Sequence, residues 1–86
     1  MRLHKMAKHT HTSVGPDGTL AKRTTERTYT HVVWVKRAKN VTQWEWAAVS
    51  WASSRLLADR AGNRWHSAAQ QDPSYICDVR VYSVNS

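Results

Sequence analysis

The sequence lacks the features that cross-link a protein or carry it into a membrane. A single cysteine, Cys77, excludes an internal disulfide. No apolar run approaches the ~20 residues of a membrane span, and the basic first residues are not followed by the apolar segment of a secretory signal. We therefore expect a cytoplasmic protein that has no membrane partner.

Acidic residues are scarce, and the shortage is confined to one part of the chain. The sequence has 13 Lys and Arg against 6 Asp and Glu, a net charge of +7. All of this excess lies in residues 1–40, whereas basic and acidic side chains balance in residues 41–86. Such an asymmetry favours an anionic partner, which is either nucleic acid or an acidic protein surface.

Phenylalanine is absent, but five tryptophans are a high count for 86 residues. Each aromatic side chain buries roughly 150–250 Å², so a few of them suffice to anchor the core of one small domain. A chain of this size cannot also enclose a deep pocket. No motif specifies a reaction, and neither the scattered histidines nor Cys77 has the partners of a catalytic or metal site. We expect a non-enzymatic protein with no cofactor and no metal.

The composition of the chain changes at about residue 28. Residues 1–27 have no aromatic residue and no apolar period, which is typical of a flexible basic arm. A short strand or hairpin within this arm, around the turn sequence Gly15-Pro16-Asp17-Gly18, stays open. Residues 28–86 are expected to form a compact domain. Their β-branched and aromatic residues predict strands over 29–37, 41–49 and 75–84.

A helix is expected between the second and third of these strands. An apolar stripe predicts it over 51–61, with a looser continuation to about residue 70 and an N-cap at Ser50 or Ser53. Gly62-Asn63 interrupts the stripe, so a break at that point stays open. The predicted fold class is α+β: a small antiparallel sheet in β-β-α-β order, with one helix on one face and a flexible basic N-terminal arm.

The alternation of side chains along strands assigns residues to two faces of the sheet. The apolar rows predict a helix-covered core that consists of Val33, Val35, Trp44, Trp46, Ala48, Leu57, Ala61, Trp65, Val79 and Val81. The open face then carries Thr30, Val32, Trp34, Lys36, Gln43, Glu45, Arg80 and Tyr82. It mixes aromatic rings with cations.

This open face is the candidate binding surface. Exposed rings of Trp34 and Tyr82 would stack on unpaired bases, and neighbouring cations would hold phosphates, to which the arm adds sequence-independent contacts. The alternative is that the arm folding back, an extra strand or a homodimer buries both rings. The residues expected to bind nucleic acid or another partner are Lys22, Arg23, Arg27, Trp34, Lys36, Arg37, Lys39, Arg80 and Tyr82.

Four stretches follow one another along the chain: Arg27-Thr28-Tyr29-Thr30-His31-Val32-Val33, the Trp-rich second strand, a helix of Ser-Arg-Leu-Leu-Ala type and a closing Asp78-Val79-Arg80-Val81. In these stretches the chain resembles short uncharacterised accessory proteins of actinobacterial phages, over about residues 17–84. The resemblance implies an accessory phage protein that acts in the host cytoplasm, and it supplies no active-site residues. We therefore carry two hypotheses. One is a protein that binds nucleic acid with low sequence specificity, and the other is a phage-encoded inhibitor or modulator of a host or defence-system protein.

Overall fold

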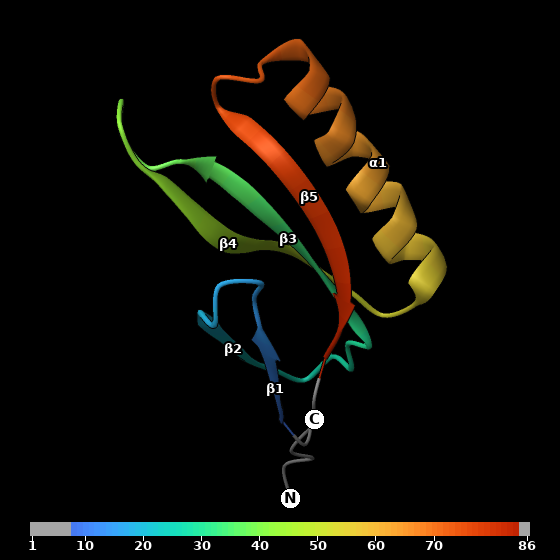
Figure 1. Cartoon of the computed structure of the whole chain (residues 1–86). Coiled ribbons are helices and arrows are strands. Elements are labelled where there is room, and N and C mark those ends of the chain that lie inside the picture. Colours follow the sequence, from blue (N-terminus) through green and yellow to red (C-terminus); the bar gives the residue numbers. More distant parts are fainter. Residues whose placement is uncertain (1–7, 85–86) are drawn as a thin grey trace, which may run out of the picture.

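A central strand that is buried on both faces organises the fold. The computed structural model describes residues 8–84, in which β3 (His31–Ala38) lies between β4 (Trp44–Ala52) and β5 (Ile76–Ser83) in an antiparallel sheet (Figure 1). The four consecutive side chains of residues 32–35 in β3 are fully buried. An uninterrupted apolar run of this kind is typical of a strand that other elements cover on both sides.

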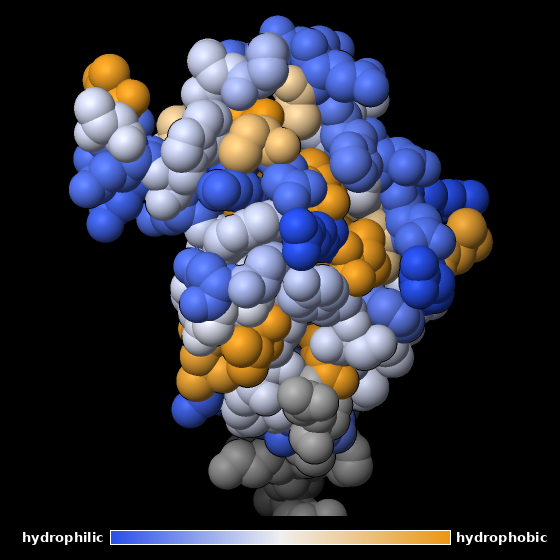
Figure 2. All heavy atoms as spheres, viewed as in Figure 1, coloured by the Kyte–Doolittle hydropathy of each residue, from blue (hydrophilic) through white to orange (hydrophobic). Residues whose placement is uncertain are grey.

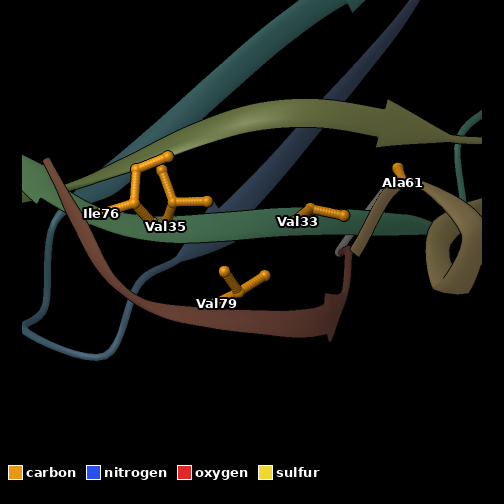
Figure 3. Close-up of a cluster of buried hydrophobic side chains, with 5 residues drawn as sticks. All are labelled: Val33, Val35, Ala61, Ile76 and Val79. Carbon is orange, nitrogen blue, oxygen red and sulfur yellow. The ribbon is translucent and has the colours of Figure 1, made fainter. Parts of the chain in front are cut away.

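The helix α1 (Arg55–Gln71) covers one face of this sheet. Its N-cap is Ser54, whose Oγ accepts a hydrogen bond from the Leu57 N–H at 3.2 Å, so the cap expected at Ser50 or Ser53 is wrong by at least one residue. The core between α1 and the sheet is formed by Val33, Val35, Ala61, Ile76 and Val79 (Figure 3).

Gly62 does not break α1, which is continuous from residue 55 to residue 71. The residue is buried, and a Cβ built on it would lie 3.3 Å from Cγ2 of Val81 on β5. A mid-helix glycine lowers helix stability by about 1 kcal/mol relative to alanine. Its position here is explained by the close approach of the helix backbone to β5.

Residues 9–25 form a β-hairpin, which corresponds to the short hairpin that was left open within the arm expected over residues 1–27. Strands β1 (His9–Val14) and β2 (Leu20–Thr25) pair antiparallel in a second sheet. Residues 1–7 of the expected arm lie outside the described residues. The hairpin that the turn sequence left open is therefore the arrangement that the structure contains.

The turn of this hairpin follows from its residues. Gly18 N–H donates to the Gly15 carbonyl at 3.0 Å around Pro16, whose fixed φ suits the first central position of a type I turn. Gly18 has a positive φ of 89°, which a residue with a side chain rarely adopts. Hydrogen bonds from the side chain of Thr19 and from its backbone N–H, the latter at 3.0 Å, lower the pKa of the Asp17 carboxyl group.

The hairpin packs on the sheet face opposite α1 (Figure 1). Trp34 Nε1 donates to Ser13 Oγ at 2.9 Å, and both side chains are buried. His11 is also buried: its Nε2 accepts from the Tyr29 N–H at 3.2 Å, and its ring meets that of Tyr29 edge-on. The exposed position expected for Trp34 is therefore wrong. The hairpin folds back over the ring, which was the alternative.

Replacing Gly15 with alanine is expected to lower the free energy of unfolding by about 1–3 kcal/mol. A Cβ at this position would meet Cζ3 and Cε3 of Trp34 at 2.7 and 2.8 Å, so the hairpin or the ring must move. Urea denaturation followed by circular dichroism measures the change. The control is Gly62→Ala, where improved helix propensity offsets the tight contact with Val81. Equal losses for the two variants would contradict the packing described here.

Strand β4 begins later than expected because the chain turns at Asn40. The Asn40 Oδ1 accepts from the Thr42 N–H at 3.0 Å, and the Asn40 amide donates to Gln43 Oε1 at 3.0 Å. These bonds hold residues 40–43 in a projecting connection, and Val41 within it is fully exposed. Figure 2 shows the connection as a protrusion with a hydrophobic end. The predicted strand over 41–49 is thus shifted to 44–52.

The α+β class with antiparallel strands and one helix is confirmed. The structure differs from the expectation in dividing its strands between two sheets instead of one. Within residues 8–84, no helix is both long enough and apolar enough to cross a membrane.

Candidate functional site

The face of the three-stranded sheet opposite α1 is only partly occupied by the hairpin. The register places Trp46 and Asp78 on either side of Lys36, and Ala48 and Arg80 on either side of Trp34. Directly paired residues in antiparallel strands share a face. Beyond the hairpin contact at Trp34, this face carries half-buried or exposed side chains, which we call the uncovered face: Lys36, Trp44, Trp46, Asp78, Arg80 and Tyr82.

Arg80 stands at the centre of the uncovered face. Its guanidinium carbon lies 5.3 Å from the centroid of the Trp46 ring, a cation–π distance. Its Nε and Nη2 donate to Asp78 Oδ2 at 3.3 and 3.2 Å. Hydrogen bonding with Tyr82 and with Asp78 raises the pKa of Arg80. The guanidinium group is thereby held over an aromatic ring.

Trp44 and Lys36 extend this cluster to its edges. Trp44 is 43% exposed at the start of β4, next to the projecting β3–β4 connection. Lys36 is directly opposite Trp46 across the β3–β4 ladder, and no salt bridge among the described residues involves it. The uncovered face therefore combines two tryptophan rings, a fixed arginine and an unpaired lysine.

The structure separates the residues that the sequence grouped as one binding surface. Lys36, Arg80 and Tyr82 lie on the uncovered face. Arg37 points to the other side of the sheet and donates to Glu45 at 2.9 Å, and Lys39 is exposed in the β3–β4 connection. Trp34 is buried. The remaining residues belong to β2 or follow it, and they are Lys22, Arg23 and Arg27.

Trp44 and Trp46 belong to the uncovered face, so their expected place in the helix-covered core is wrong, as is that of Ala48. The reason is a register shift between Val33 and Trp34, where β4 contains one additional residue, Val49. An extra residue of this kind inverts the side-chain alternation on the strand beyond it. A sequence signal for the true register exists, because placing Glu45 opposite Arg37 pairs opposite charges.

A second register shift, in β5, changes the position of Cys77. Lys36 pairs with Asp78 and Arg37 pairs with Ile76, so Cys77 is the additional residue between them, and it is exposed. Among residues 8–84 no cluster of His, Cys, Asp or Glu has the composition of a metal site.

Two features of the chain thus bear on function: the net charge of +7 and the aromatic and cationic side chains of the uncovered face. Comparison of the chain with protein-family models, with curated proteins and with solved structures gives no match in any of the three.

Proposed function

We propose that the protein binds single-stranded nucleic acid on the uncovered face, with low sequence specificity. The observation that carries this proposal is the Arg80 guanidinium 5.3 Å from the centroid of the Trp46 ring, beside the exposed Trp44 and the unpaired Lys36. Proteins that bind single strands without sequence preference combine such stacking surfaces with cations that follow the backbone.

Unpaired bases stack on aromatic rings and on the planes of arginine side chains. On the uncovered face, Arg80 adds its guanidinium plane to the Trp46 ring, and Asp78 fixes the orientation of that plane. Each stacked base contributes roughly 1–3 kcal/mol, and this term is similar for all bases because each has a flat face. The arrangement therefore supports binding that is tolerant of sequence.

The charge of the chain supports the same proposal. A net charge of +7 attracts polyanions over distances of about 10 Å at 0.1 M salt. Lysines that neutralise phosphates release condensed counterions, so the affinity falls steeply as salt increases. Lys36 pairs with Trp46 across the β3–β4 ladder, and Lys39 is exposed in the adjoining connection, so both would contact the phosphates of a strand that stacks on Trp46.

Replacing Trp46 with alanine is expected to weaken binding of a single strand by roughly 5- to 150-fold, which corresponds to the loss of one stacked base. Fluorescence anisotropy with a labelled oligonucleotide of about 12 nucleotides, at about 50 and 200 mM salt, measures the affinity. The wild-type protein should bind the single strand more tightly than a duplex of the same sequence, because only unpaired bases expose their faces. Circular dichroism of the variant confirms that it is folded.

A matched pair of arginine variants controls this measurement. Arg80→Ala removes the guanidinium over Trp46, whereas Arg55→Ala removes an arginine that is paired with Asp59 on the exposed side of α1. Both variants lose one positive charge, so only a site-specific role makes Arg80→Ala the weaker binder. Equal affinities, or no binding by the wild-type protein at low salt, would contradict the proposal. The phage-encoded inhibitor of a host protein would then be the surviving hypothesis.

A further inference from the structure

A cavity of about 420 Å³ lies at the C-terminal end of β4, where the chain passes into α1. Its wall is formed by three segments: the connection after β2, the end of β4 and the first half of α1. This volume is in the range of sites that hold a small organic ligand. The cavity is lined by Arg27, Tyr29, Ser50, Trp51, Ala52, Ser53, Leu57, Arg60, Ala61 and Arg64, which we call the arginine cavity.

The arginine cavity has three cations and no carboxylate in its lining. Arg60 and Arg64 are four residues apart on α1, so they occupy the same side of the helix, and Arg27 joins them from the connection after β2. The salt bridges within residues 8–84 use other arginines. Two like charges at this helical spacing repel one another by roughly 0.2–0.5 kcal/mol, and a bound anion would relieve that repulsion.

The acidic residues nearest in sequence do not neutralise this cluster. Asp59 precedes Arg60 but accepts a hydrogen bond from Arg55 Nε at 2.9 Å and lies outside the lining of the arginine cavity. Glu26 precedes Arg27, is exposed, and is also outside the lining. Guanidinium groups bind phosphate through paired N–H donors, which makes a phosphate the anion best suited to a cavity lined by several arginines.

An aromatic wall adjoins the three arginines. The rings of Tyr29 and Trp51 lie 6.2 Å apart between centroids, at an angle of 49°. Arg23 of β2 places its guanidinium 5.4 Å from the centroid of the Tyr29 ring, on the side of the hairpin. Apolar groups of Ala52, Leu57 and Ala61 complete the wall. A flat, partly apolar group can pack against such a surface while its charged end meets the arginines.

We infer that the arginine cavity binds a nucleoside phosphate, with the phosphate held by Arg27, Arg60 and Arg64 and the base packed beside Trp51. Its volume admits one such unit. The arginine cavity shares no residue with the uncovered face, so this inference does not depend on the proposed function. The unit is either a free nucleotide or the phosphorylated end of a strand, and the two sources have the same chemistry.

A titration with adenosine monophosphate tests the inference. Nuclear magnetic resonance spectra monitor it through the side-chain N–H signals of the five tryptophans. The Trp51 signal should shift with saturation, and adenosine without phosphate should bind at least about tenfold more weakly, because it makes no charge-assisted hydrogen bonds. The double variant Arg60→Ala/Arg64→Ala should lose at least about tenfold in affinity. Both arginines are exposed, so this variant should fold.

Two controls separate this site from the uncovered face. Arg55→Ala removes a charge from the same helix but not from the arginine cavity, and Trp46→Ala alters only the uncovered face, so neither should change the affinity for the nucleotide. A strand with a 5′-phosphate, compared with the same strand without it, identifies the end of a strand as the source if only the phosphorylated form shifts Trp51. The inference is overturned if neither the nucleotide nor the phosphorylated strand shifts Trp51. It is equally overturned if the double variant binds as the wild-type protein does.

Discussion

Replacing Trp34 with alanine is expected to lower the free energy of unfolding by about 3–5 kcal/mol. The ring is fully buried between β3 and the hairpin, and its removal leaves a void that the surrounding backbone can fill only in part. Small domains have a total stability of about 5–15 kcal/mol, so this one side chain accounts for a large part of the stability of the chain. Urea denaturation followed by circular dichroism measures the loss.

Ser13→Ala is the companion variant, because it keeps the Trp34 ring and removes only its hydrogen-bond acceptor. A buried N–H without a partner costs about 1–3 kcal/mol, so this variant should be intermediate between the wild-type protein and Trp34→Ala. A Trp34→Ala protein that keeps its full stability but loses affinity for nucleic acid would reverse the assignment. That result would place the ring on the binding surface that the sequence predicted.

Deleting residues 1–26 is expected to abolish cooperative unfolding. The deletion removes β1 and β2 and exposes Val32 and Trp34 to water. The tryptophan alone accounts for roughly 4–6 kcal/mol, at about 25 cal/mol per Å² over its roughly 150–250 Å². This amount is comparable with the whole stability of a small domain. Near-ultraviolet circular dichroism and a urea titration detect the loss of the transition.

Adding the hairpin back as a separate peptide tests whether the loss of folding is due to the missing hairpin. A synthetic peptide of residues 8–27, added in excess to the truncated chain, should restore the tertiary signal, and the same peptide with Ser13 and Gly15 replaced by leucine should not. A truncated chain that unfolds cooperatively without the peptide would show that residues 27–86 fold alone. The division of the chain at residue 28, which the sequence predicts, would then stand.

The elements of the sheet and the helix were predictable because each has a strong local signal. The run Val32-Val33-Trp34-Val35 indicates a strand, and the apolar stripe around Ala58 and Ala61 indicates a helix, whatever the rest of the chain does. The same run also indicates that both faces of the strand are covered, which the sequence-based prediction did not include. Four consecutive apolar residues are typical of a strand covered on both faces, which requires a second covering element besides one helix.

The hairpin and the uncovered face were not predictable from hydrophobic pattern alone. The inward side chains of the hairpin include Ser13 and His11, which are polar and become buried only because Trp34 and Tyr29 supply their hydrogen-bond partners. On β4, a single additional residue at Val49 reverses the faces of Trp44 and Trp46. Both features depend on contacts between segments far apart in the chain, which periodicity within one segment does not report.

The close packing of the Trp34 ring against the hairpin limits which sequences can adopt this fold. The ring leaves room for a hydroxymethyl group at position 13 and for a hydrogen at position 15, and these positions precede it by about twenty residues. A larger side chain at either position would need a smaller ring at position 34, so substitutions at the three positions should be correlated. These positions therefore form a sequence signature for distant relatives whose overall similarity is low. The signature consists of two small residues separated by one position and, about twenty residues later, an aromatic residue within an all-apolar strand.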